Sequence, residues 1–262
     1  MRFGNQVNRA GLWVIVLGFI VNGSAQAGVD NEAVEAGMVE FQGGAGPIKG
    51  YLARPKGDGP FPAVVVIHEW WGLSDWIKEN ARRLAGEGYV ALAVDLYGGK
   101  ATNDPGEAHE LMRALNEKEG VADLKGGVAY LESLPYVRKG EKVGAVGWCM
   151  GGGYARKLAQ ESERIGPTAV CYGAVTLDAE ELAHLKGKPV LGIFGADDRG
   201  IPTDRVKQFA SALKNEGNSV GLHIYEGAGH GFMRPGGPQH NAKAAADAWT
   251  RIDDFFAKNL KK

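Results

Sequence analysis

Cysteine is scarce in this sequence: its 262 residues include two, Cys149 and Cys171. They do not form a Cys-x-x-Cys pair, which argues against a thiol–disulfide oxidoreductase. No cluster of cysteine and histidine has the spacing of zinc ligands, so we expect no metal site. Strongly basic segments are also missing, and the chain carries 30 basic and 31 acidic residues. We therefore expect no nucleic-acid partner.

The apolar run near the N-terminus is too short to span a membrane. It covers residues 11–21, well below the roughly 20 residues that a spanning helix needs. A positively charged start precedes it and Ala-Gln-Ala follows at 25–27, an arrangement typical of a secretory signal peptide. We expect residues 1–27 to be a signal peptide and residues 28–262 to be a single domain. The mature protein would then be exported, periplasmic or secreted, with no stable membrane association.

The rest of the chain alternates between two hydrophobic patterns. Residues 63–67 (AVVVI) are wholly apolar and β-branched, as in a strand buried on both faces, whereas residues 74–87 have apolar side chains at helical spacing. This alternation predicts an α/β fold with a mostly parallel central sheet, helices on both faces and a leading antiparallel hairpin. We expect strands at residues 37–41, 48–54, 63–67, 89–96, 142–148, 168–172, 189–194 and 220–225, and helices at 74–87, 104–119, 121–134, 150–163, 203–215 and 242–260.

A sharp turn with a cysteine at its apex follows one of these strands. Residues 143–153 read VGAVGWCMGGG, an apolar run that ends in Gly-x-Cys-x-Gly-Gly before a helical segment. This is the layout of the nucleophile elbow of α/β-hydrolases, with Cys149 in place of the usual serine. Gly147 and Gly151 suit the turn because a Cβ at either position would crowd it. The N–H of Met150 opens the helix and can face a developing oxyanion.

The second cysteine raises the question of a disulfide, which an oxidising compartment permits. We favour free thiols, because Cys149 belongs to the elbow and Cys171 lies in the apolar run 168–172. A buried core residue is the simpler interpretation of Cys171.

A thiol nucleophile needs a base, and the base needs an acid that orients it. His230 lies between glycines after the last strand, and the chain order nucleophile, acid, base is that of α/β-hydrolases. His68, at a strand end, is the second choice of base. Asp197 and Asp198 both follow the strand at 189–194 and could fix the histidine tautomer. The spacing to the downstream proline favours Asp198, and Asp197 remains the alternative.

Together these motifs resemble the dienelactone hydrolase family (carboxymethylenebutenolidases), which are thiol hydrolases with the α/β-hydrolase fold. The resemblance runs from Met38 to the C-terminus and is carried by HEWWG at 68–72, DLY at 95–97, GWCMGG at 147–152, GADDRGIP at 195–202 and AGHGF at 228–232. It implies a triad of Cys149, Asp198 and His230. It also implies that Glu69 lies beside the thiol and helps to control its ionisation. The resemblance implies a second oxyanion-hole N–H from Trp70 and no metal or organic cofactor.

The implied partner is a small-molecule ester or lactone. Family members bind a substrate carboxylate with two arginines; Arg234 fills one position, whereas Gly99 occupies the other. Lys100 is adjacent, but a flexible ammonium does not reproduce the fork of a guanidinium. We assign Lys100 and Tyr97 to the substrate site together with Arg234.

Four tryptophans are candidates for an apolar acyl pocket, with ordinary packing as the alternative: Trp70, Trp71, Trp76 and Trp148. The sequence thus predicts an exported, monomeric cysteine-dependent ester or lactone hydrolase. The alternative is a non-catalytic small-molecule-binding protein on the same scaffold. The complete set of cysteine, aspartate and histidine favours the enzyme, since a binding protein has no need of a triad.

Overall fold

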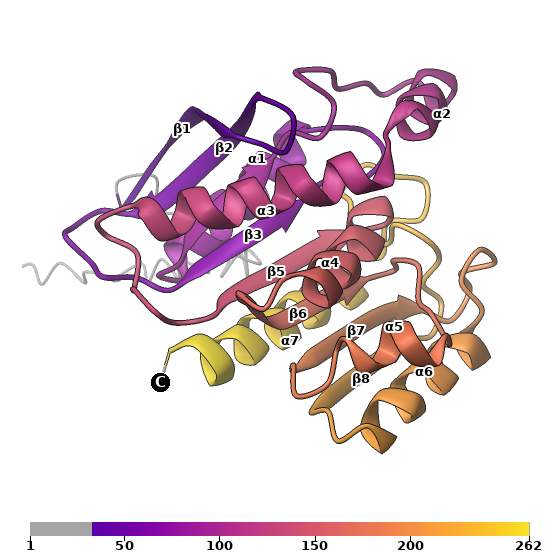
Figure 1. Ribbon diagram of the computed structural model, residues 1–262. Coiled ribbons are helices and arrows are strands. Elements are labelled where there is room, and N and C mark those ends of the chain that lie inside the picture. Colours follow the sequence, from indigo (N-terminus) through magenta and orange to yellow (C-terminus); the bar gives the residue numbers. More distant parts are fainter. Residues whose placement is uncertain (1–32, 262) are drawn as a thin grey trace, which may run out of the picture.

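A twisted sheet runs through the molecule (Figure 1). The computed structural model describes residues 33–261, which form an eight-stranded sheet with the order β1-β2-β4-β3-β5-β6-β7-β8. β2 runs antiparallel to both of its neighbours, and β3 to β8 pair in parallel. The strands are β1 (Val34–Gln42), β2 (Pro47–Pro55), β3 (Ala63–Ile67), β4 (Val90–Val94), β5 (Val143–Trp148), β6 (Ile165–Cys171), β7 (Val190–Gly195) and β8 (Val220–Tyr225).

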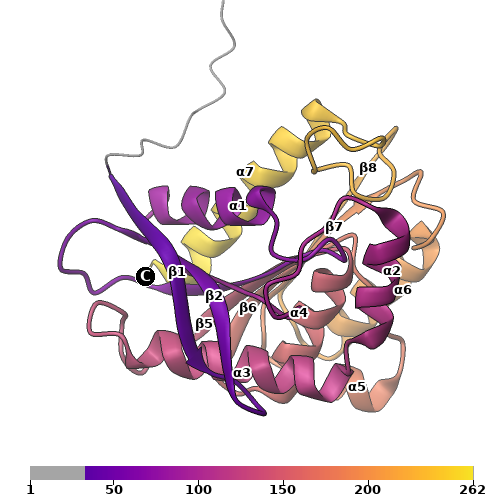
Figure 2. The ribbon, with the colours of Figure 1, turned by 90° about the horizontal axis from the view of Figure 1, so that it is seen from above.

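Helices cover both faces of this sheet, which confirms the expected α/β class. Figure 2 shows α1 and α7 on one face and α3 and α4 on the other. The helices are α1 (Asp75–Gly86), α2 (Pro105–Ala114), α3 (Glu117–Ser133), α4 (Met150–Glu161), α5 (Ala179–Ala183), α6 (Thr203–Asn215) and α7 (Ala242–Leu260). The predicted signal peptide and its cleavage site lie outside the described residues and stay a prediction.

The apolar run of β3 shows why this layering follows from the sequence. Successive side chains of a strand point to opposite faces, and Val65 and Ile67 enter the core under α3 and α4, whereas Val64 and Val66 enter the core under α1 and α7. Every residue of β3 is buried. A strand with both faces covered needs apolar residues at each position, which is the pattern that the sequence displays.

Among the helices, one break lies at a different position from the sequence-based expectation, and one short helix was not expected. The break between α2 and α3 lies at Asn116, a few residues before the expected one, because the Asn116 side chain accepts hydrogen bonds from the N–H groups of Lys118 and Glu119. An N-cap of this kind satisfies donors that the first helical turn leaves free. The sequence pattern does not predict α5, because its five residues are too few to display a helical period.

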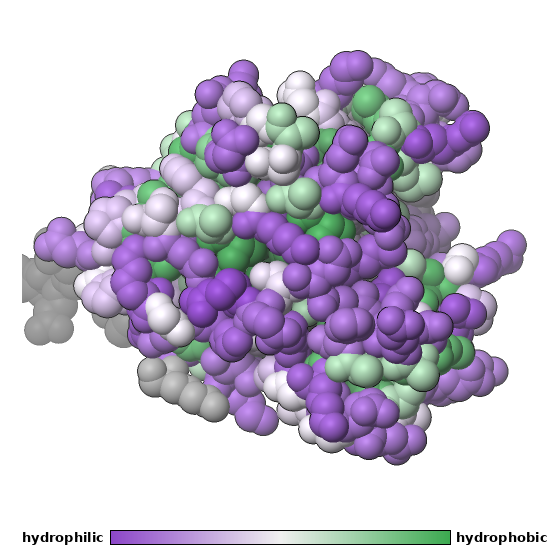
Figure 3. Space-filling view, viewed as in Figure 1, coloured by the Kyte–Doolittle hydropathy of each residue, from purple (hydrophilic) through white to green (hydrophobic). Residues whose placement is uncertain are grey.

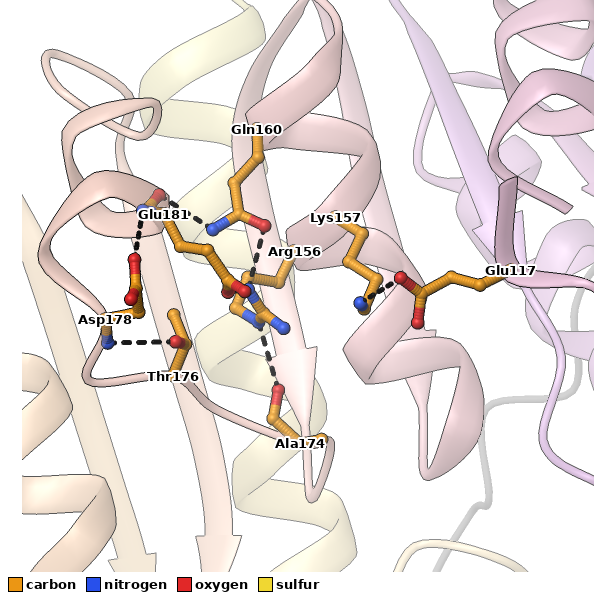
Figure 4. A network of polar contacts seen from close by, with 8 residues as sticks. All are labelled: Glu117, Arg156, Lys157, Gln160, Ala174, Thr176, Asp178 and Glu181. Atoms are coloured by element: carbon orange, nitrogen blue, oxygen red, sulfur yellow. Dashed lines mark hydrogen bonds and ion pairs between the residues drawn. The ribbon is translucent and has the colours of Figure 1, made fainter. Parts of the chain in front are cut away.

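A buried arginine ties α4 to the segment that follows β6 (Figure 4). The Arg156 guanidinium donates to the carbonyl oxygen of Ala174, to the side chain of Gln160 and to the carboxylate of Glu181, at 3.2, 2.8 and 2.8 Å. Gln160 also donates to the carbonyl oxygen of Glu181 at 2.7 Å. A buried charge requires such partners, so this network fixes α4 and α5 relative to each other.

The surface offers little continuous apolar area on the face seen in Figure 3, where hydrophilic residues surround small hydrophobic patches. Met38 and Leu177 are the large hydrophobic side chains most exposed among residues 33–261. Single exposed apolar residues of this kind are ordinary for a folded domain. Within that part of the chain no helix is both long and apolar enough to cross a membrane.

Candidate active site

The elbow cysteine lies between β5 and α4 in a strained backbone conformation. Cys149 has φ 55° and ψ −120°, which a non-glycine residue rarely adopts. Its N–H donates to the carbonyl oxygen of Cys171 at 3.0 Å, and its own carbonyl accepts from Gly152 at 3.0 Å. Backbone strain of this kind persists only where the surroundings hold it. Here it lifts the side chain off the end of the sheet.

Two glycines let the elbow pack directly against its neighbours. A Cβ on Gly147 would overlap the backbone of Gly151 in the first turn of α4. A Cβ on Gly151 would overlap the carbonyl of Ile67 and lie 2.5 Å from the carbonyl oxygen of His68. The start of α4 therefore touches the end of β3 backbone to backbone, and the overlap at Gly147 confirms that a Cβ there would crowd the turn.

A histidine and an aspartate approach the thiol from the loops after β8 and β7. His230 Nε2 lies 3.1 Å from Cys149 Sγ, and His230 Nδ1 lies 2.7 Å from Asp198 Oδ2. The other oxygen of Asp198 accepts from the N–H groups of Gly200 and Ile201 at 2.9 and 3.1 Å. Asp197, the alternative acid, is exposed. The structure thus places Asp198, and not Asp197, behind the histidine.

The hydrogen bonds of this cluster shift its protonation. Burial lowers the pKa of His230, but the hydrogen bonds to Asp198 and Cys149 outweigh this effect and raise the pKa to about 10. Burial opposes ionisation of Asp198, yet its bonds to His230 and to two backbone N–H groups hold its pKa below the usual value. Because the carboxylate accepts from Nδ1, it leaves Nε2 to face the thiol. The arrangement can take up the proton of the thiol and hold it on the imidazole.

Glu69 lies in the same site, as the family resemblance implied. Its side chain is buried at the end of β3 and lines a cavity together with Cys149 and His230. Burial raises the pKa of Glu69 to about 7, although the positive charges of Arg234 and His230 act in the opposite direction. A carboxyl group that titrates near neutral pH beside a thiol is typical of a functional site.

The cavity at the thiol measures about 400 Å³ and is mostly apolar. Trp70, Trp71 and Met112 contribute apolar walls, and Arg234 supplies a positive charge. The Arg234 guanidinium lies 4.7 Å from the Trp71 ring centroid and donates to Asn103 Oδ1 at 2.9 Å. Stacking and a hydrogen bond together hold the guanidinium in place. The sequence does not indicate a role for Met112, because nothing distinguishes it from an ordinary residue of a helix.

The two remaining candidates for substrate binding are not among the residues that line this cavity. Tyr97 and Lys100 line a different cavity of about 300 Å³, beside α2 and α3. The Tyr97 hydroxyl contacts Met150 Sδ at 3.3 Å, so this side chain lies behind the first turn of α4. The N–H of Gly99 donates to Asp95 at 2.6 Å, which closes a tight turn after β4. Lys100 follows this turn and lines that second cavity, not the one at the thiol.

The four tryptophans divide into two groups. Trp70 and Trp71 line the cavity at the thiol. Trp148 is completely buried in the core, and the Trp76 ring packs against it at 5.4 Å between centroids. The pocket interpretation therefore holds for the first pair, and the alternative of ordinary packing holds for the second.

The second-choice base, His68, is completely buried and does not face the thiol. Its Nδ1 lies 2.6 Å from the carbonyl oxygen of Glu69, and its Nε2 accepts from the N–H of Leu96 at 3.2 Å. The backbone N–H groups of Trp70 and Met150, the proposed oxyanion donors, have no acceptor among the described residues. In residues 33–261 no group of three or more histidine, cysteine, aspartate or glutamate side chains is arranged to hold a metal ion.

The sheet order, the strand–turn–helix elbow and the loops after β7 and β8 define an α/β-hydrolase. The acylaminoacyl peptidase of Pyrococcus horikoshii has the same fold, with a TM-score of 0.71, 18% identity, and coverage of 88% of this chain and 42% of that one. Residues 48–260 match the model of the dienelactone hydrolase family, and the chain belongs to that family.

Two family relatives span nearly the whole of this fold. A Saccharolobus solfataricus protein named "Putative carboxymethylenebutenolidase" is 34% identical over 252 residues, which cover 82% of this chain and 95% of the relative. The structure of the dienelactone hydrolase-like promiscuous phosphotriesterase P91, from metagenomic libraries, has a TM-score of 0.79 and 27% identity, and the match covers 87% of this chain and 99% of P91. Family membership makes the present chain a hydrolase of the ester and lactone class.

Proposed function

We propose that the protein hydrolyses small esters or lactones through a thioester on Cys149, with His230 as the base and Asp198 as the group that orients it. The observation that supports this most directly is the line of contacts from Sγ to Nε2 at 3.1 Å and from Nδ1 to the carboxylate at 2.7 Å. Nucleophile, base and orienting acid within hydrogen-bond reach are the geometric signature of covalent catalysis.

The first half of the reaction transfers the acyl group to sulfur. His230 takes the proton of the Cys149 thiol, and the thiolate attacks the carbonyl carbon of the substrate. The oxyanion that forms is stabilised by the N–H groups of Met150 and Trp70, which otherwise lack an acceptor among the described residues. When the tetrahedral intermediate collapses, the C–O bond breaks and His230 protonates the departing alkoxide. In a lactone this alkoxide remains attached to the acyl group.

The second half regenerates the enzyme. A water molecule loses a proton to His230 and attacks the thioester carbonyl, and the same two N–H groups bind the second oxyanion. The C–S bond then breaks, the thiolate of Cys149 recovers a proton from His230, and a carboxylic acid leaves. Glu69 titrates near neutral pH beside these groups, and its charge adjusts how readily the thiolate forms.

The lining of the cavity suggests the class of substrate. Its walls from Trp70, Trp71 and Met112 favour an apolar acyl group, and Arg234 can pair with one carboxylate. Gly99 and Lys100 add no second cation to this cavity. We therefore propose substrates that carry an apolar acyl group and at most one carboxylate. Arg234→Met should lower kcat/KM for a carboxylate-bearing lactone about tenfold or more, and leave an uncharged aryl ester much less affected.

A substrate panel with two matched variants tests the proposal. The wild type is assayed on lactones, aryl esters, thioesters and, because of the similarity to P91, an aryl phosphotriester. Cys149→Ala should abolish turnover, and Cys171→Ala, which removes the buried thiol, should retain it. Turnover by Cys149→Ala at the wild-type rate would refute the proposal. Tight binding of a lactone by the wild type without any turnover would favour the binding-protein alternative.

A further inference from the structure

His68 is completely buried at the end of β3, and neither of its ring nitrogens faces the thiol. Nδ1 contacts the carbonyl oxygen of Glu69 at 2.6 Å, and a carbonyl can only accept, so Nδ1 carries the proton. Nε2 accepts from the N–H of Leu96 at 3.2 Å, so it carries the lone pair. These two partners fix one neutral tautomer. Burial lowers the pKa of His68, which keeps the ring neutral.

The carbonyl that His68 holds belongs to the peptide unit that ends in the N–H of Trp70. A trans peptide is planar, and its C=O and N–H point in opposite directions. The Glu69 carbonyl accepts from two donors, the His68 ring at 2.6 Å and the N–H of Gly72 at 3.2 Å. Fixing the carbonyl on one side therefore fixes the Trp70 N–H on the other. That N–H has no acceptor among the described residues.

The two peptide units just before this one lie beside the first turn of α4. The backbone of His68 and Ile67 is so close to Gly151 that a Cβ there would overlap it. Trp70 and Cys149 line one cavity, and the Trp70 N–H, which points away from the carbonyl that His68 holds, is free to donate to an acyl oxygen bound to the thiol. The bond to Leu96 anchors the imidazole to the end of β4, which gives the peptide a rigid support.

We infer that His68 is a positioning residue for the oxyanion hole: its Nδ1–H holds the Glu69 carbonyl and thereby aims the Trp70 N–H at the oxyanion. This inference rests on the proposed thioester mechanism. It assigns His68 a task in transition-state stabilisation without contact with the substrate. Preorganised donors of this kind matter because they need no reorientation as charge develops.

Two conservative variants of His68 test the donor at Nδ1 and the acceptor at Nε2 separately. His68→Asn keeps an N–H at the position of Nδ1 and loses the acceptor for Leu96. His68→Gln can offer an acceptor near the position of Nε2 and loses the donor to the Glu69 carbonyl. We expect Asn to retain kcat within about threefold of wild type and Gln to lose about 10²-fold, with KM changed much less, because an oxyanion donor acts in the transition state.

A second readout distinguishes positioning from general damage. Alkylation of Cys149 by iodoacetamide displaces iodide and forms no acyl oxyanion, so its rate should be the same in His68→Gln as in wild type. Equal losses of kcat in the two variants, or a slower alkylation that matches the loss of kcat, would overturn the inference. Nitrogen NMR of the wild-type ring is independent of any variant: it should show a proton on Nδ1 and a lone pair on Nε2, and the opposite tautomer would also overturn it.

Failure of the inference about His68 can be distinguished from failure of the proposed thioester mechanism. Turnover by Cys149→Ala would remove the thioester mechanism and this inference together. An inactive Cys149→Ala combined with a fully active His68→Gln would remove this inference alone.

Discussion

The backbone N–H of Cys149 donates to the carbonyl oxygen of Cys171 at 3.0 Å, so the two cysteines lie at adjacent strand ends. Both are free thiols, but their surroundings differ. Cys149 lines the cavity beside His230, whereas Cys171 is completely buried and burial raises the pKa of its thiol. The same end of the sheet thus holds one thiol placed for reaction and one placed for packing.

Selective alkylation follows from this difference. In the native protein at pH 7, iodoacetamide should modify Cys149 and leave Cys171 unmodified until the protein is denatured. His230→Ala should slow the modification at least tenfold, since it removes the group that takes the proton. Mass spectrometry of peptides from native and denatured samples measures the extent of modification of each cysteine, in the wild type and in His230→Ala. Equal labelling of the two cysteines in the native state would contradict the burial of Cys171.

The two neighbouring aspartates form a natural matched pair. Asp198→Asn should lower kcat by about 10² to 10⁴-fold, because an amide can no longer fix the histidine tautomer. Asp197→Asn, at an exposed position, should leave kcat within about threefold of wild type. Steady-state kinetics on one aryl ester compares them directly. A larger loss in Asp197→Asn would mean that the acid is the other residue of the pair.

The buried carboxyl of Glu69 makes stability depend on pH. Its pKa rises from 4.5 to about 7 on folding, so between these values the folded state holds a proton that the unfolded state has released. Stability from this group is present below pH 4.5 and is lost as the pH rises towards 7. A pKa difference of this size between the folded and unfolded states corresponds to about 3 kcal/mol in the free energy of unfolding.

Glu69→Gln cannot ionise and escapes this loss. Relative to wild type, its free energy of unfolding should increase by about 3 kcal/mol between pH 4.5 and pH 8, measured by urea denaturation. Glu40→Gln, which changes an exposed carboxyl, serves as the control and should show no such trend. A Glu69→Gln difference that is independent of pH would show that Glu69 is ionised throughout.

Two glycines of α4 should respond in opposite ways to alanine. Gly151→Ala introduces a Cβ that overlaps the carbonyl of Ile67, so it should destabilise the protein by about 2 kcal/mol or more and reduce kcat. Gly153→Ala meets Ala174 at an ordinary 3.5 Å and should be neutral, or stabilising by up to about 1 kcal/mol, because alanine favours the helix. Thermal unfolding of both variants decides whether the packing of the elbow is as tight as the structure shows.

Sequence reasoning succeeded where a local pattern determines the outcome. The fully apolar run of β3 indicates a strand covered on both faces, and the spacing of glycines around Cys149 predicts the elbow. The helix limits of α6 and α7 agree with their apolar periodicity.

The outcomes that no local pattern determines depend on the direction of a single side chain. Lys100 is adjacent to the position of an expected arginine, but the turn at Gly99 carries it into another cavity. Trp148 is the last residue of the strand that leads into the elbow, and it packs into the core instead of the site. The break at Asn116 depended on one capping side chain, which a hydrophobic period does not reveal.

The strands that carry the candidate site differ in how deeply they are buried. Cys149 follows β5, in which every residue is buried, whereas His230 follows β8, an edge strand whose residues are all half-buried. Edge segments open locally at a lower free energy than central strands. On warming, the imidazole should therefore leave the sulfur before the sheet itself melts. The protein would lose its activity while most of its far-UV circular dichroism signal persists. It would regain activity on cooling because the core of the sheet stays folded.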